Sequence, residues 1–333
     1  MSFTNIFTDG VLVDLNIRKW TAERALQPED LGLKPDAVPK AFKLGQKALV
    51  PREVIAQFNN LDYQARHTLT TYSYPFAFGN ARFVPKKVFN EFIKKLEEIS
   101  KEYANLANDF VSKYENYKIN MRPNYVQAAH VAYARFAKMS GYMGDEDEFV
   151  NNFLARVDTY YPPVKELREK FSLEYVVYQM AMPDLSQATV DDVVSEEGKA
   201  ELVKDVYKSA LYEKVHAYVD DIVSQLRGKA DDVLSLFKNN LNEGKRISEA
   251  SLNMIRNMIS EYEKMDIIGD ISFLDKMKAF KAKYIDGTSA DKIREDFELK
   301  KNMYKELEEL SKLASDKSAI QALSDAYRQK ISL

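Results

Sequence analysis

A long, uninterrupted helical period is the feature that most constrains the fold of this chain. After Pro85, large apolar side chains recur every three or four residues, with lysines and glutamates between them. The apolar seam consists of Phe89, Phe92, Leu96, Ile99, Tyr103, Leu106, Phe110, Tyr114 and Tyr117. This pattern predicts one helix of about 32 residues, roughly 48 Å long. Because a single seam of that length must be covered, it also predicts a bundle of long antiparallel helices.

The rest of the chain continues this helical pattern between recognisable stop signals. We expect a helix after Pro123 to about Met139 and, beyond a glycine-rich break, another from about Asp145 to Tyr160. Further long helices are expected between Thr189 and Ile331. The apolar run from Glu174 to Met182 fits either a strand or a buried helix. The predicted fold class is therefore mainly α, an elongated bundle of long antiparallel helices.

The first 85 residues differ from this pattern and predict a small N-terminal α/β module. Val11 to Ile17 alternates as a strand does, and the stretch that follows to Leu26 favours a helix. Residues 34–50 are expected to form a loop, and Pro51 is expected to open a helix that reaches about Thr70. The predicted domains are accordingly 1–85 and 86–333, the second with a candidate subdivision near 183–189.

A β-hairpin is the clearest motif of this module. Aromatic residues alternate with small ones from Tyr72 to Phe78, and Gly79-Asn80 separates them from a second short run that ends at Val84. Pro75 has no N–H to donate to a neighbouring strand. The first strand of the hairpin is therefore expected at the edge of its sheet.

Composition and charge exclude several classes of protein. The chain contains no cysteine, which removes disulfides, thiolate nucleophiles and cysteine metal sites. Its net charge of -3 gives no reason to expect nucleic-acid binding through bulk positive charge. Neither a secretion signal nor a membrane-spanning run is seen, so we expect no membrane association and a cytoplasmic location.

No catalytic motif is found in the sequence. There is no phosphate-binding glycine loop, and the three histidines lie far apart. Glu213 and His216 form a single ExxH, but the second copy that a di-iron bundle needs is missing. A charged helix face explains that pair better. We therefore predict no catalytic, cofactor-binding or metal-binding residue, and we expect that the protein is not an enzyme.

Two sets of residues carry functional hypotheses. Aromatic rings of the hairpin beside a small basic patch could stack on the bases of a single-stranded nucleic acid, although packing against a helix is the favoured interpretation of such a stripe. These candidate residues are Tyr72, Tyr74, Phe76, Arg82, Lys86 and Lys87. The second set, Tyr304, Leu307 and Leu310 of the last helix, is expected to bind a partner protein or a second copy, unless it fills the core.

Several short runs resemble an uncharacterised family of bacteriophage, prophage and plasmid proteins that is known only as a domain of unknown function. The resemblance rests on the stretch from Val11 to Leu26 with Trp20, on Lys43 to Pro51, on Arg82-Phe83-Val84-Pro85 and on Phe110 to Tyr114. Val131 to Phe136 and Ile271 to Asp275 are similar to it as well. None of these runs is catalytic.

The resemblance implies an origin in a mobile element, whose genes often stand near those of a MoxR-type AAA+ ATPase and a von Willebrand A-like protein. It makes such an ATPase a candidate partner. The leading hypothesis is a helical adaptor or accessory protein that binds a protein partner. The alternatives are a single-stranded nucleic-acid-binding protein that uses the aromatic hairpin, and a structural virion or assembly component.

Overall fold

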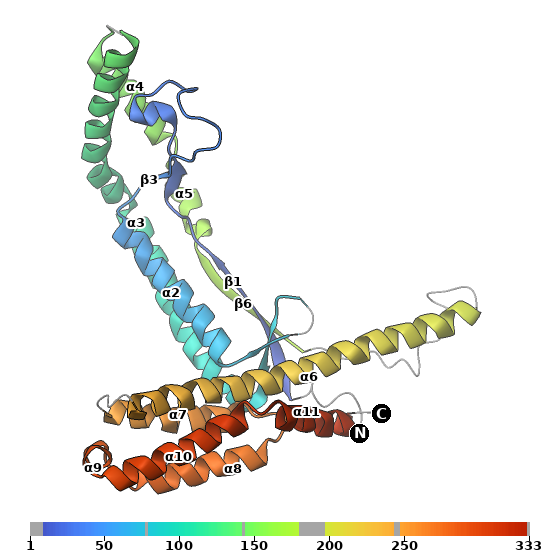
Figure 1. Ribbon diagram of the computed structural model, residues 1–333. Helices are drawn as coiled ribbons and strands as arrows, with labels where there is room; N and C mark the ends of the chain where they lie inside the picture. Colours follow the sequence, from blue (N-terminus) through green and yellow to red (C-terminus); the bar gives the residue numbers. More distant parts are fainter. Residues whose placement is uncertain (1–8, 77–78, 142–143, 180–196, 243–246, 332–333) are drawn as a thin grey trace. The chain divides into compact units, whose positions relative to one another are not determined.

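The computed structural model of the protein describes residues 9–76, 79–141, 144–179, 197–242 and 247–331. Helix accounts for 71% of the chain, and the strands form a small sheet near the N-terminus (Figure 1). The prediction of a mainly α protein with a hairpin module is therefore confirmed. The candidate subdivision near 183–189 lies outside the described residues.

The helices are long in the middle of the chain and shorter towards its end. Those before residue 180 are η1 (Pro28–Leu31), α2 (Arg52–Thr71), α3 (Lys86–Ser140), α4 (Glu146–Asp158), α5 (Val164–Leu167) and η2 (Arg168–Lys170). Those after it are α6 (Glu197–Asn242), α7 (Glu249–Met265), α8 (Ile271–Phe280), the π-helical turn η4 (Lys281–Asp286), α9 (Ala290–Glu295), α10 (Phe297–Ala314) and α11 (Lys317–Ile331).

The strands of the described residues form two sheets. They are β1 (Gly10–Arg18), β2 (Glu23–Ala25), β3 (Gln46–Ala48), β4 (Tyr74–Pro75), β5 (Arg82–Pro85) and β6 (Ser172–Tyr178). The larger sheet has the order β4-β5-β1-β6, and β2 pairs with β3. Tyr74 lies opposite Phe83 in the hairpin, with β4 at the edge of the sheet. The edge position predicted from Pro75 is confirmed.

Two local elements were predicted wrongly from the sequence, and a third was left open between strand and helix. The stretch before Leu26 forms β2 and not a helix, because its pairing with β3 outweighs local propensity. Pro123 does not separate two helices but lies inside the 55-residue helix α3. The apolar run of residues 174–182 is resolved as β6 over its described part. In the last part of the chain, helices are interrupted at Asp296, which caps the start of α10, and at Ser315, which follows its end.

The chain divides into two compact units. Unit 1 comprises residues 1–14, 69–93 and 176–333, and unit 2 comprises residues 15–68 and 94–175. The boundary falls within the elements β1, α2, α3 and β6. The separate domain boundary expected at residue 85 concerns independent folding and stays a prediction.

Unit 2 is built on α2 and α3, which lie side by side (Figure 1). The ring of Phe58 on α2 stacks on Phe171 at 4.5 Å and meets Tyr103 of α3 edge-on at 5.4 Å. Tyrosine hydroxyls of α3 donate to backbone carbonyls of neighbouring segments, as Tyr103 does to Arg18 and Tyr125 to Ala48. Burial raises the pKa of both phenols to about 12. The part of the predicted helical seam from Leu96 to Tyr114 thus contributes to the core of this unit.

Unit 1 is a helical body in which α6 packs against α7, α10 and α11, and α8 against α7 and α10. Buried apolar side chains of these helices fill its interior, among them Leu234, Phe237, Ile255 and Leu307. Ser248 caps α7 and Ser289 caps α9, as the sequence indicates for Ser248 and for the Gly287-Thr288-Ser289 stop.

Candidate functional site

The aromatic residues of the hairpin are buried in unit 1. Tyr72, Tyr74 and Phe76 are each less than a tenth exposed. The Tyr74 hydroxyl donates to the carbonyl of Met265, and burial raises the pKa of Tyr74 far above its ordinary value. The ring of Phe76 lies edge-on to Tyr218 at 5.5 Å. These rings are therefore packed against helices, which is the arrangement favoured from the sequence.

The basic residues of the hairpin region have structural partners as well. Arg82 Nε donates to Ser73 Oγ at 2.6 Å. Lys86 and Lys87 are exposed, and Lys87 Nζ donates to the carbonyl of Asp266 at 3.2 Å. The basic residues of the nucleic-acid hypothesis therefore lie near aromatic rings that are buried and not available for stacking on bases. Nucleic-acid binding by this set stays an untested prediction.

The candidate partner-binding residues of the last helices lie on α10. Leu307 is fully buried and Leu310 is 5% exposed, contrary to the exposure expected for them, because α10 packs on α6. Tyr304 is half-buried. Leu310 also lines a groove of about 830 Å³ between α8, η4 and α10, whose rim carries Lys283 paired with Glu306. Partner binding by these residues stays a prediction.

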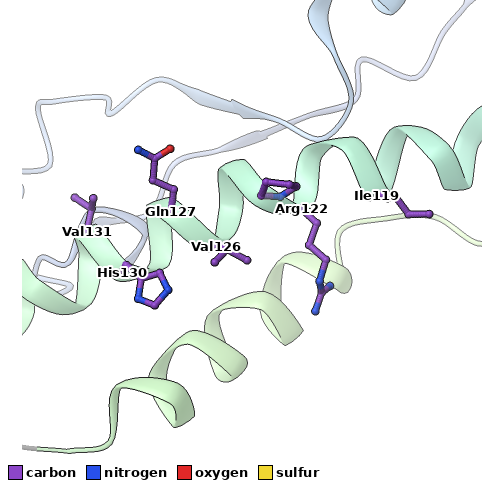
Figure 2. A pocket seen from close by; sticks show the side chains of 7 residues that line it. Ile119, Arg122, Val126, Gln127, His130 and Val131 are labelled. Atoms are coloured by element: carbon purple, nitrogen blue, oxygen red, sulfur yellow. The ribbon is translucent and has the colours of Figure 1, made fainter.

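A second candidate surface is an exposed apolar face on α3, which was not predicted from the sequence. It lies in unit 2 and extends along one side of the helix, where it lines a pocket of about 610 Å³ (Figure 2). We call it the α3 surface; it consists of Ile119, Arg122, Pro123, Val126, Gln127, His130 and Val131. Ile119 is 65% exposed and Val131 is 48% exposed, so this apolar surface is solvent-facing.

Pro123 explains part of the chemistry of the α3 surface. Proline has no N–H, so the carbonyl of Ile119, one turn earlier, receives no helical hydrogen bond from position 123. One end of the apolar face therefore holds a backbone acceptor that the helix leaves unused. Towards its other end, His130 Nδ1 lies 2.7 Å from Glu146 Oε1 of α4.

A cleft adjoins the α3 surface and shares Ile119 and Arg122 with it. This cleft has a volume of about 420 Å³ and reaches between α3 and α4, where Leu154 and Val157 contribute apolar walls. Arg122 lies 3.5 Å from Asp158 across the cleft. Apolar walls with charged residues at the rim are typical of protein-binding surfaces.

Neither surface gathers three or more metal-ligating side chains. Among the described residues, no three or more histidine, aspartate or glutamate side chains gather in a group that could hold a metal ion. No helix in the described part of the chain has the length and apolar character needed to cross a membrane.

The fold and these surfaces define a mainly helical protein with exposed apolar faces suited to protein contacts. The chain belongs to the family described as Protein of unknown function (DUF3150), whose model matches residues 8–288. The matched region includes the whole α3 surface, whereas α10 lies beyond it. No curated protein and no solved structure matches the chain.

Proposed function

We propose that this protein is a non-enzymatic adaptor that binds a protein partner through the α3 surface. The observation that carries the proposal is the solvent exposure of Ile119 and Val131 on a helix whose other apolar side chains are largely buried. Exposing apolar side chains to water is unfavourable, and covering them with a partner protein lowers the free energy.

The spacing along the α3 surface favours a helical partner segment. Ile119, Pro123, Val126 and His130 follow one another at intervals of four, three and four residues, which places them on one helix face. The face is roughly 18 Å long at 1.5 Å per residue. An amphipathic helix could cover it with its own apolar stripe, while a donor from the partner could reach the Ile119 carbonyl.

A AAA+ ATPase is the partner that the family resemblance favours. We expect the MoxR-type ATPase of the same mobile element to bind the purified protein in isothermal titration calorimetry. Ile119→Asp should weaken the affinity at least tenfold, because a buried carboxylate would replace the most exposed apolar contact of the α3 surface.

Met139→Asp supplies the matched control for this experiment. Met139 is 59% exposed on the same helix but lies outside the α3 surface. Its replacement should leave the affinity unchanged, and circular dichroism should show the same helix content in both variants. Equal affinity of the Ile119→Asp variant and the wild type would rule out the α3 surface as the binding site.

A single-stranded nucleic-acid-binding protein is the less favoured function. Tyr72, Tyr74 and Phe76 would have to leave the interior before they could stack on bases. We therefore expect no salt-dependent retention of the protein on single-stranded DNA. Retention that disappears in the Lys86→Glu variant would instead favour nucleic-acid binding.

A further inference from the structure

A separate cavity in unit 2 has features that the adaptor proposal does not use. It has a volume of about 360 Å³ and lies where the η1 turn meets α3 and α4. Its apolar walls are Leu33, Pro35, Phe136, Phe149 and Phe153. Asn152 and Glu148 of α4 and Glu29 of η1 also line it. The cavity is large enough for one aromatic side chain.

Gly32 allows the η1 turn to lie close to α3 and so fixes the wall of the cavity that the turn forms. Its φ of +70° is in the left-handed region, and a Cβ at this position would lie 2.1 Å from the carbonyl oxygen of Ala132 on α3. Only glycine permits so close an approach of the two backbones. The turn therefore holds Glu29 and Leu33, on either side of Gly32, against the helices.

An unpartnered donor is buried beside the cavity. Arg156 Nη2 donates to Asp30 Oδ1 at 2.9 Å, and the guanidinium lies 5.1 Å from the ring centre of Phe153. Arg156 Nε is buried and has no hydrogen-bond partner among the described residues. Buried N–H groups are nearly always paired in folded proteins. A backbone carbonyl of a bound segment would supply the acceptor that this N–H lacks.

The mouth of the cavity is acidic. Glu29 and Glu148 make no ion pair among the described residues, and Glu148 ends the run Asp145-Glu146-Asp147-Glu148 that opens α4. Positive side chains next to an inserted apolar group would be attracted here. The cavity therefore selects an apolar side chain that is flanked by lysine or arginine.

The chain itself carries such a segment in unit 2, beyond the cavity residue Pro35. After Pro35 the chain forms the loop that leads to β3 (Figure 1), and Phe42 in this loop is 69% exposed. Lys40 and Lys43 flank Phe42, are exposed, and make no ion pair among the described residues. Phe42 with its two lysines matches the cavity in both size and charge.

We propose that the cavity binds Phe42 of a second copy of this chain. The inserted ring packs among Phe136, Phe149 and Phe153, while Lys40 and Lys43 of that copy approach Glu29 and Glu148. Each copy carries both the ring and the cavity, so two copies satisfy each other reciprocally in a two-fold symmetric contact. This site is separate from the α3 surface and does not depend on the proposed function.

Sedimentation velocity over a concentration series up to about 100 µM tests the self-association. We expect a concentration-dependent dimer in the wild type. Phe42→Ser and Asn152→Trp, which fills the cavity from an exposed position, should each weaken the dimer at least tenfold. Met139→Ser, at an exposed methionine elsewhere in the unit, should leave it unchanged, as should Ile119→Asp on the α3 surface.

Mixing the two variants distinguishes a contact in trans from damage to the fold. The Phe42→Ser copy retains an open cavity and the Asn152→Trp copy retains Phe42, so the mixture can form one of the two contacts and should associate more strongly than either variant alone. The absence of native cysteine allows a direct check. Phe42→Cys mixed with Asn152→Cys should form a disulfide-linked dimer, whereas Phe42→Cys mixed with Glu166→Cys should not.

Three results would overturn the proposal. A wild-type chain that stays monomeric at the highest concentration leaves no second copy to occupy the cavity. A dimer that survives both Phe42→Ser and Asn152→Trp uses another surface. A disulfide that forms within one chain of the double Phe42→Cys, Asn152→Cys variant, with no linkage on mixing the single variants, assigns the cavity to the chain's own loop.

Discussion

Each compact unit holds a buried aspartate in an ion pair, but the two arrangements differ. In unit 1, Asp270 accepts hydrogen bonds from Nε and Nη2 of a single residue, Arg227, at 2.5 and 2.9 Å, and from the Tyr262 hydroxyl at 2.6 Å. In unit 2, Asp30 accepts from two separate cations, Lys47 at 2.6 Å and Arg156 at 2.9 Å. Both carboxylates are almost fully buried.

The difference concerns what remains when one cation is lost. Arg227 is the only cation that contacts Asp270 in the described structure, and its Nη1 also donates to the carbonyl of Leu313 on α10. Its side chain is 6% exposed. Arg156 is 37% exposed, and Lys47 remains beside Asp30 without it. Loss of the one arginine that pairs with Asp270 should therefore destabilise unit 1 more than loss of one of the two cations beside Asp30 destabilises unit 2.

Arg227→Met should produce the largest effect. It removes the fork and leaves the Asp270 carboxylate buried with only the Tyr262 hydroxyl, so we expect the free energy of unfolding to fall by about 3–5 kcal/mol. Urea unfolding followed by circular dichroism measures this loss. Hydrogen–deuterium exchange should accelerate in peptides of α7, α8 and α10 more than in those of α4.

The double variant Arg227→Met, Asp270→Asn tests the cause of that loss. Asparagine at position 270 carries no charge but can still accept the Tyr262 hydrogen bond, so the double variant should be more stable than Arg227→Met alone. No recovery would mean that lost packing, and not an unpaired carboxylate, accounts for the effect.

Tyr262→Phe should have the next largest effect. The Tyr262 hydroxyl donates to a charged acceptor, and hydrogen bonds to charged groups contribute about 1.5–3 kcal/mol. The matching change in unit 2 is Tyr125→Phe, whose hydroxyl donates to the neutral Ala48 carbonyl. That change should lower the free energy of unfolding by about 1 kcal/mol. Equal losses in the two variants would contradict the distinction drawn between the acceptors.

Arg156→Met should be milder than Arg227→Met. Lys47 and the backbone N–H of Gln27 still donate to Asp30 in this variant, so the carboxylate keeps a counter-charge. We expect a loss of about 1 kcal/mol in the free energy of unfolding. A loss as large as that of Arg227→Met would show that the two units are equally sensitive, and the comparison would fail.

The elements of both units could be predicted where the signal is local. The period from Phe89 to Tyr117 predicted the first part of α3, and Gly79-Asn80 predicted the hairpin. The continuation of α3 through Pro123 could not be predicted, because a proline costs a helix one hydrogen bond and packing of Tyr125, Ala129 and Ala132 against α4 compensates for that cost.

The candidate sites were less predictable than the fold. The aromatic stripe of the hairpin looked the same whether it faced solvent or a helix, and only the tertiary contacts of Tyr74 and Phe76 decided between these. Likewise, the spacing of Leu307 and Leu310 marks an apolar face but not what covers it. The cavity beside Arg156 joins η1, α3 and α4, which are far apart in the sequence, so no local pattern could have indicated it.

A third aspartate, Asp62, is partly exposed and should contribute less to stability than Asp270 or Asp30. Asp62 of α2 accepts from Lys19 and Arg66, each at 2.6 Å, and its side chain is 16% exposed. Burial alone would raise the pKa of the Asp62 carboxyl, but the two cations outweigh it and hold that pKa below its ordinary value. A lowered pKa in the folded state stabilises the protein above the unfolded pKa of about 4, and this contribution is lost as the pH falls through the lowered value.

Asp62→Asn should therefore have the smallest effect, and one that depends on pH. At pH 7 we expect the free energy of unfolding to fall by about 0.5–1 kcal/mol, since the pair is partly solvated. As the pH falls from about 4 through the lowered pKa of the folded Asp62 carboxyl, the difference from the wild type should shrink, because the wild-type carboxyl then becomes protonated as well. Urea unfolding at both pH values measures this difference in the free energy of unfolding.

Asp109→Asn is the control. It removes the exposed pair with Lys113 and should leave the free energy of unfolding nearly unchanged at either pH. A loss in Asp62→Asn that grows on acidification would have the wrong sign and would mean that burial, and not the two cations, controls this carboxyl.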